Sequence, residues 1–236
     1  MRKFCWFLYL AAFFLWGTIK AQHIYYKNPD AKTIRVFKDS AKRILNLDTG
    51  NLLAKQFNYV LKFYPEMRVK NIIVEFKPSS KTVHTKPKFG AIFKLPEQRV
   101  YKITLSRGTK TTLDSILIDN LSFNSQLGLI ANQVSIIEDL STGGFFNFIS
   151  WYVKHLTHKG SKKILTEAEQ KTLEVGLGYQ LLSYNRECEE KLKIDNWTST
   201  KGYTNYMRHY RNRAMKPQLI VNLMNDMPVY VSKTYK

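Results

Sequence analysis

The chain has 236 residues, of which 37 are Lys or Arg and 18 are Asp or Glu, giving a formal net charge of +19. This length suits one sizeable hydrophobic core, and no linker-like stretch divides it, so we expect one domain after the N-terminal segment. The two cysteines, Cys5 and Cys188, are too few for a cysteine-rich metal site.

The first 21 residues have the pattern of a secretory signal peptide. A basic start precedes an apolar run from Phe4 to Trp16, and Ala21 provides a cleavage position. We therefore predict a signal peptide over 1–21, a single domain over 22–236, and export to the periplasm or cell envelope. The alternative is an uncleaved anchor, because the apolar stretch is only slightly shorter than the roughly 20 residues that span a bilayer.

Cleavage after Ala21 would remove three positive charges and no negative one, changing the net charge from +19 to +16. It would also leave Cys188 as the only cysteine, so no intramolecular disulfide could form. For an exported basic protein we expect no nucleic-acid partner. An anionic membrane surface, a peptidoglycan-like polymer and an acidic protein remain, as does a charge that serves only solubility.

The first half of the chain combines helical and strand-like patterns. Apolar residues recur at helical spacing from Ser40 to Tyr64, with Thr49-Gly50 as a break. Three runs rich in β-branched or apolar residues follow, and we predict strands over Val69–Phe76, Phe89–Leu95 and Arg99–Ser106. Turn residues separate them, so we expect a small, mostly antiparallel sheet.

A central amphipathic helix is predicted over Leu121–Leu140, where apolar residues follow three-and-four spacing. The aromatic stretch that follows, residues 143–155, fits either a core helix or a helix lying in a bilayer interface. In the second case Lys159, Lys162 and Lys163 would contact an anionic membrane surface.

Further helices are predicted near the C-terminus. One extends from Leu165 to Tyr184, with Thr166 and Glu169 at capping-box spacing. Gly176 and Gly178 lie inside it and indicate a close helix contact or a local break. A last helix is predicted over Pro217–Met224. The fold class is therefore α+β, with a sheet packed on the central helix and further helices after it.

Five sequence pieces together carry a family resemblance. They are Phe63-Tyr64-Pro65-Glu66, Lys86-Pro87, Tyr101-Lys102-Ile103, Leu121 to Asp139, and Gly176-Leu177-Gly178-Tyr179-Gln180-Leu181. In this order they resemble a family of small exported zincin-like metalloproteases of bacterial envelopes, over nearly the whole predicted domain. The resemblance implies a zincin-like fold in which an H-E-x-x-H helix binds zinc and its Glu activates water. In that family Gln126 and Gly128 would precede the motif.

The match fails at the residues that carry the chemistry. Asn132 stands for the first zinc-binding His, Gln133 for the Glu base, Ile136 for the second His and Leu165 for the third ligand. None of these side chains is a good zinc ligand or a base. Glu169 takes the place of a nearby acidic residue, and we interpret it as a helix cap. We therefore predict no catalytic residue, no metal and no other cofactor at these positions.

No other arrangement of residues marks a catalytic site. His155 and His158 are three apart, as two ligands on one helix could be, but no acidic residue lies nearby, so we expect a surface feature. Serine and lysine nucleophile motifs are also absent from the sequence.

The sequence thus predicts an exported, catalytically degenerate metalloprotease-like protein that binds a polypeptide in a vestigial cleft or associates with the envelope. Two alternatives stay open. One is an active zinc peptidase with a non-standard metal site, and the other is a basic structural component held at a membrane surface.

Overall fold

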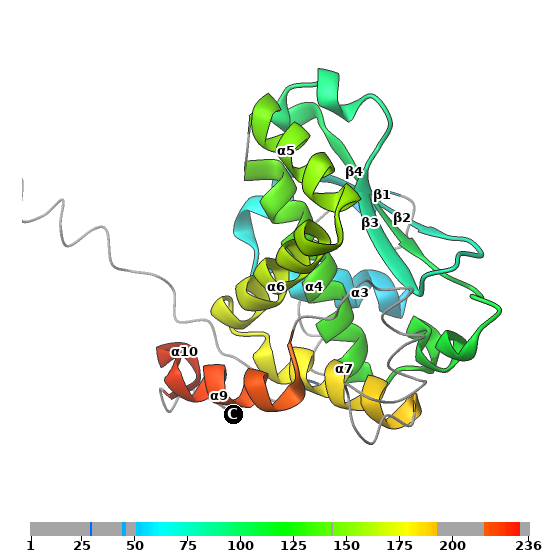
Figure 1. Cartoon of the computed structure of the whole chain (residues 1–236), viewed down its shortest axis with the longest axis vertical. Coiled ribbons are helices and arrows are strands. Elements are labelled where there is room, and N and C mark those ends of the chain that lie inside the picture. Colours follow the sequence, from blue (N-terminus) through cyan, green and yellow to red (C-terminus); the bar gives the residue numbers. More distant parts are fainter. Residues whose placement is uncertain (1–28, 30–43, 46–50, 143, 193–214, 232–236) are drawn as a thin grey trace, which may run out of the picture.

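A computed structural model describes residues 29, 44–45, 51–142, 144–192 and 215–231 of the chain (Figure 1). The predicted signal peptide over 1–21 lies outside these residues, as does the basic aromatic run 203–213 of the sequence. The described part is α+β and mostly helical, as predicted. Within it, no helix is both long and apolar enough to cross a membrane.

The strands form a mixed sheet in the order β1-β2-β4-β3. The four strands are β1 (Ile44–Leu45), β2 (Asn71–Phe76), β3 (Val83–Pro87) and β4 (Val100–Leu105). β2 runs parallel to both β1 and β4, and only β3 pairs antiparallel, with β4. The expectation of a mostly antiparallel sheet is therefore wrong.

The position of β4 explains this difference. The chain leaves β2, forms β3 at the edge and returns between the two, so that β4 pairs with β2 from Asn71↔Val100 to Phe76↔Leu105. Tyr101, Ile103 and Leu105 of β4 alternate along the strand, so they lie on one face of the sheet, and all three are almost fully buried. The apolar content of β4 was visible in the sequence, but its neighbours in the sheet were not.

Two of the predicted elements are different in the structure. Residues 89–95 do not form a strand, because Gly90 has a left-handed backbone (φ 79°) and leads into a short 3-10 turn at Ala91–Phe93. Ile44–Leu45, predicted as helix, pairs instead with Ile72 and Ile73 of β2. In both cases the tertiary setting, not the local apolar pattern, determines the backbone conformation.

The described residues also form seven α-helices, one between β1 and β2 and six after β4. They are α3 (Leu52–Leu61), α4 (Phe123–Thr142), α5 (Phe145–Leu156), α6 (His158–Glu174), α7 (Gly178–Lys191), α9 (Pro217–Asp226) and α10 (Pro228–Val231). The predicted central helix is α4, and most of its 20 residues are buried. It packs against the sheet, α3, α6 and α7 (Figure 1).

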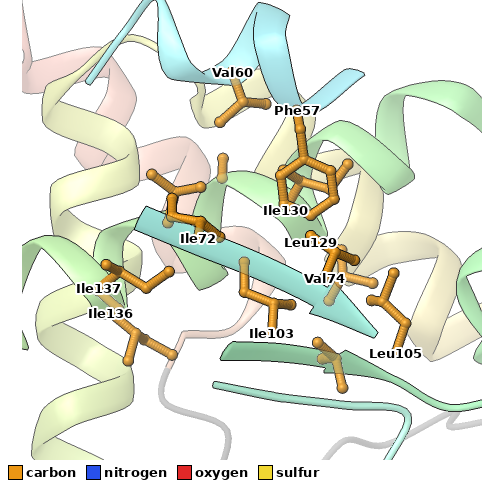
Figure 2. Packing of buried hydrophobic residues seen from close by; sticks show 14 of the residues in the cluster. Phe57, Val60, Ile72, Val74, Ile103, Leu105, Leu129, Ile130, Ile136 and Ile137 are labelled. Atoms are coloured by element: carbon orange, nitrogen blue, oxygen red, sulfur yellow. The ribbon is translucent and has the colours of Figure 1, made fainter. Parts of the chain in front are cut away.

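The main core lies between α4, α3 and the sheet. Figure 2 shows side chains from all three directions meeting there. Leu129, Ile130, Ile136 and Ile137 come from α4, Ile72 and Val74 from β2, Ile103 and Leu105 from β4, and Phe57 and Val60 from α3. The apolar residues of α4 lie on more than one face of the helix. Such a helix is expected to be buried on several sides, and α4 is buried in this way.

The segment predicted as one helix from Leu165 to Tyr184 is two helices, α6 and α7. Gly176, with φ 92°, ends α6: its N–H donates to the Leu173 carbonyl (2.9 Å), and the Leu177 N–H donates to the Thr172 carbonyl (3.1 Å). This pair of bonds is the Schellman motif, which favours glycine at the left-handed position. The local break indicated by Gly176 and Gly178 is confirmed.

The start of α6 also differs from the prediction. The helix begins at His158, and the Thr157 side chain caps it by accepting a hydrogen bond from the Gly160 N–H at 3.0 Å. Thr166 and Glu169 therefore lie inside the helix, and Thr166 donates to the Lys162 carbonyl at 2.9 Å. The proposed capping box is wrong, because polar residues at the right spacing also occur within helices.

Candidate functional site

The three degenerate positions on α4 are all buried. Asn132 is 3% exposed, Gln133 5% and Ile136 6%. Ile136 belongs to the main core, beside Ile137 (Figure 2). A polar ring at position 136 would displace part of this packing, so the present residue serves the core.

Gln133 connects α4 to the edge of the sheet. Its side-chain oxygen Oε1 accepts a hydrogen bond of 2.9 Å from the Thr85 hydroxyl on β3. Thr85 is itself buried. An amide oxygen used in this way can hold a strand in place, but it cannot take a proton from water as a carboxylate base does.

Asn132 is buried with one atom unused. Its side-chain oxygen Oδ1 has no hydrogen-bond partner among the described residues. Native proteins leave few such atoms, since an unpaired buried polar group costs about 1–3 kcal/mol. The side chain at this position is therefore not optimised for packing.

Leu165 lies away from the three α4 positions. The Ser135 and Thr172 hydroxyl oxygens are 3.0 Å apart, which sets these residues of α4 and α6 side by side. Leu165 precedes Thr172 by about two turns, or about 10 Å along the helix axis. It is half-buried against the main core. A carboxylate at position 165 would not share a zinc ion with side chains at 132 and 136, whose ligand distances are only about 2 Å.

Glu169 has a structural partner. The residue is 1% exposed, and its Oε2 accepts a hydrogen bond of 3.0 Å from the backbone N–H of Met215, next to the start of α9. The interpretation of Glu169 as a helix cap is wrong, because the residue lies inside α6 and its side chain binds the backbone just before α9.

A buried hydroxyl network joins α4 and α6 to the segment before β2. Tyr64 Oη lies 2.7 Å from Ser135 Oγ, which in turn lies 3.0 Å from Thr172 Oγ1, and Thr172 donates to the Ala168 carbonyl at 2.8 Å. Burial raises the pKa of the Tyr64 phenol well above its usual range. The phenol therefore stays neutral and acts as a structural hydrogen-bonding group.

An acidic cleft of about 480 Å³ opens beside this network, between the C-terminal half of α4 and α6. Its charged residues are Glu66, Glu138, Asp139, Glu167 and Glu174, with Lys171 as the basic member. The sequence analysis did not predict the cleft. The signal was present in the spacing of Glu167, Lys171 and Glu174 on one face of α6, but the sequence does not show which helix that face meets.

The cleft alters the titration of two of its carboxyl groups. Burial raises the pKa of Glu138, with Lys171 opposing the shift from 3.9 Å. Burial also raises the pKa of Asp139, and the neighbouring charge of Glu167 adds to the shift. Carboxylates in this setting attract cationic groups, which would lower both pKa values.

The histidines do not extend the site. The exposed His155 ring stacks on Trp151 with centroids 4.9 Å apart, and the His158 side chain lies outside the described positions. Among the described residues, no three His, Cys, Asp or Glu side chains are grouped so that they could hold a metal ion.

Comparison with known proteins adds no relative: no family model, no curated protein and no solved structure matches this chain.

Proposed function

We propose that this protein is an exported, catalytically degenerate zincin-like domain that holds an extended polypeptide without cleaving it. The zincin-like assignment rests on the sequence resemblance, and the function follows from the way the edge of the sheet meets the central helix. The bound polypeptide would add to the sheet as a further strand.

One observation carries the proposal: the hydrogen bond between Thr85 of β3 and Gln133 of α4 (2.9 Å). Of the described strands, β3 is at one edge of the sheet and is the one that runs antiparallel. The bond places this edge strand against the helix position that the resemblance assigns to the catalytic Glu. In a peptidase of this class, a substrate strand beside the edge strand would pass over that position.

The backbone of β3 is oriented for strand addition. The Ser106 N–H donates to the Thr82 carbonyl (2.8 Å) and the Lys88 N–H to the Val100 carbonyl (2.8 Å), so even-numbered residues of β3 bond to β4. In an antiparallel pair the alternate residues point their N–H and C=O groups the other way. Val83 and Thr85 therefore direct these groups away from β4, toward the side where another strand would pair.

The α4 positions support binding without cleavage. Gln133 offers an amide where the reaction needs a base, and Ile136 offers a hydrocarbon where zinc needs a ligand. The contacts of Gln133 and Ile136 are with β3 and the core, so both contribute to stability as they are.

The test is binding of fluorescein-labelled, reduced casein to the full chain, followed by fluorescence anisotropy and by gel electrophoresis over hours with added zinc. We expect saturable binding, an intact casein band and slower amide exchange at residues 83–87 in the complex. Absence of binding, or protection confined to other segments, would contradict the polypeptide-binding proposal. Cleavage that stops on chelation of zinc would establish the active peptidase instead.

A further inference from the structure

Helix α5 leaves most of its apolar side chains outside the core. Only two of them, Phe148 and Trp151, are buried, and Phe148 also lies under the Arg99 guanidinium at 4.8 Å. The others are at least one-third exposed, with Phe146 at 82% and Leu156 at 76%: Phe145, Phe146, Ile149, Tyr152, Val153 and Leu156. The expectation of an ordinary core helix therefore accounts for only one side of α5.

A second exposed aromatic segment lies beside α5. The 3-10 turn at Ala91–Phe93 contacts the helix, and Figure 1 shows both at the same end of the molecule. Phe89 is 103% exposed, Phe93 88% and Leu95 64%. Phe89, Phe93 and Phe146 alone present roughly 500 Å² of side-chain surface. We call the exposed residues of α5 together with Phe89, Phe93 and Leu95 the aromatic patch.

An apolar surface of this size normally has a partner. The largest apolar patch of a typical soluble monomer has an area of about 300–600 Å². The three phenylalanines alone reach roughly 500 Å², and the other exposed side chains add to the area of the aromatic patch. Its side chains project from a helix and a turn, and none of them lines the cleft between α4 and α6.

The charges around the aromatic patch specify the partner. Residues 76–96 contain five lysines and no acidic residue, and residues 143–166 contain four lysines and no acidic residue. The lysines near the patch in sequence include Lys86, Lys88, Lys94, Lys154, Lys159, Lys162 and Lys163. Five acidic side chains lie in the cleft between α4 and α6, where Glu167 pairs with Lys163 at 3.6 Å, and Glu97 follows Leu95 of the patch by two residues. Aromatic side chains with lysines around them suit the boundary between acyl chains and anionic headgroups.

We propose that the aromatic patch docks on an anionic lipid membrane. The exposed aromatic and aliphatic side chains enter the headgroup region, and the lysines pair with lipid phosphates at its rim. The aromatic patch contains no residue of β3, and membrane docking goes beyond polypeptide binding, so either proposal can fail alone. A membrane satisfies both the apolar area and the positive rim, whereas a second copy of this basic chain would bring like charges together.

The test uses a local probe on the patch in the full chain. Residues 4–19 are apolar in sequence, so co-sedimentation of the whole chain with vesicles does not identify the contacting surface. Phe146→Cys is therefore labelled with the fluorophore NBD in a Cys5→Ser background, where the fully buried Cys188 stays unlabelled. Leu219→Cys, on the exposed side of α9, provides the control position.

We expect vesicles of phosphatidylcholine with phosphatidylglycerol to shift the emission of the probe at position 146 to the blue, and to leave position 219 unchanged. The variant Lys159→Gln, Lys162→Gln, Lys163→Gln should weaken binding on the order of 100-fold at low salt, because each lysine near an anionic surface contributes severalfold. The matched variant Lys110→Gln, Arg186→Gln, Lys216→Gln has the same net charge, and its three substitutions are at exposed positions outside the aromatic patch. It should bind the vesicles as tightly as the parent does.

Three outcomes would overturn the proposal. The first is no emission shift of the probe at position 146 with anionic vesicles, and the second is an equal shift with vesicles of pure phosphatidylcholine. The third is that the two triple variants weaken vesicle binding equally. A blue shift without lipid that grows with protein concentration would also overturn it, and would assign the aromatic patch to contact between copies of the chain.

Discussion

Gly128 of α4 lies directly against the backbone of Gln180 in α7. A Cβ atom added to Gly128 would lie 2.2 Å from the Gln180 carbonyl oxygen and 2.5 Å from the carbonyl carbon. The two residues are far apart in the chain, and each belongs to a sequence piece that carries the family resemblance. One helix turn before this contact on α4, the Ser125 and Ser183 hydroxyl oxygens lie 3.0 Å apart. At Gly128, α4 thus packs directly on the backbone of α7.

The first prediction concerns this contact. Gly128→Ala should destabilise the protein by about 3 kcal/mol, although alanine normally favours a helix, because the new methyl group would meet backbone atoms that cannot rotate away. Urea unfolding of parent and variant would measure the change in the free energy of unfolding.

Gly108→Ala is the control for Gly128→Ala. A Cβ atom at position 108 would meet nothing within 4 Å, so this change should alter the free energy of unfolding by less than about 0.5 kcal/mol. Equal effects of the two substitutions would mean that α4 and α7 do not approach as closely as described.

The helices could be predicted from sequence more fully than the sheet. α4 and α9 were predicted almost within their bounds, because apolar residues at helical spacing mark each of them. β3 was not predicted, since Val83-His84-Thr85-Lys86-Pro87 contains only one strongly apolar strand former. Its conformation depends on pairing with β4 and on the Thr85–Gln133 bond, neither of which is local.

The second prediction concerns the buried hydroxyl network. Tyr64→Phe removes the group that lies 2.7 Å from Ser135 Oγ and 3.3 Å from the Ala131 carbonyl, and should cost about 1–2 kcal/mol of stability. Ser135→Ala should cost a similar amount. Because both changes break the same bond, the double variant should cost less than the sum of the single ones, and a double-mutant cycle by urea unfolding would measure the coupling. Strict additivity would show that the network is not formed.

The third prediction concerns pH and His84 on β3. The pKa of His84 is lowered to about 4, mainly by burial and also by the charges of Lys81, Lys86 and Lys77, whereas the charge of Glu75 opposes the shift. The unfolded chain, with a His pKa of about 6.5, binds more protons between pH 6.5 and 4, so the folded state loses stability as pH falls through this window.

His84→Gln should remove this loss. Between pH 7 and pH 5 the parent should lose on the order of 1 kcal/mol more stability than the variant, after a discount for the partial exposure of the ring. Urea unfolding at both pH values would measure the difference. Parallel pH dependence in the two proteins would show that His84 titrates normally in the folded state.

The candidate site could be predicted only in part. Asn132, Gln133 and Ile136 were predicted to lie on one helix, because helical spacing fixes their relative positions. All three lie on α4. Leu165 and Glu169 were assigned roles from their distance in sequence, but the crossing of α6 over α4 determines which residue faces which. The bonds of Ser135 to Thr172 and of Glu169 to Met215 show that arrangement, and no local pattern contains it.

The last prediction tests the outer edge of β3 with two proline substitutions. Val83→Pro removes an N–H that points away from β4, so the sheet keeps its hydrogen bonds, but it also trims a side chain of the main core, and stability should fall by about 1–2 kcal/mol. Lys86→Pro removes an N–H in register with Lys102 of β4 and should cost about 2–3 kcal/mol, although the Lys86 side chain is exposed. Casein binding should respond in the opposite order, because a polypeptide paired with the outer edge needs the Val83 N–H and not that of Lys86. Anisotropy titrations under conditions where both variants are folded would measure the two affinities. If Val83→Pro binds casein as tightly as the parent, the polypeptide does not pair with β3, and a different surface must carry any binding.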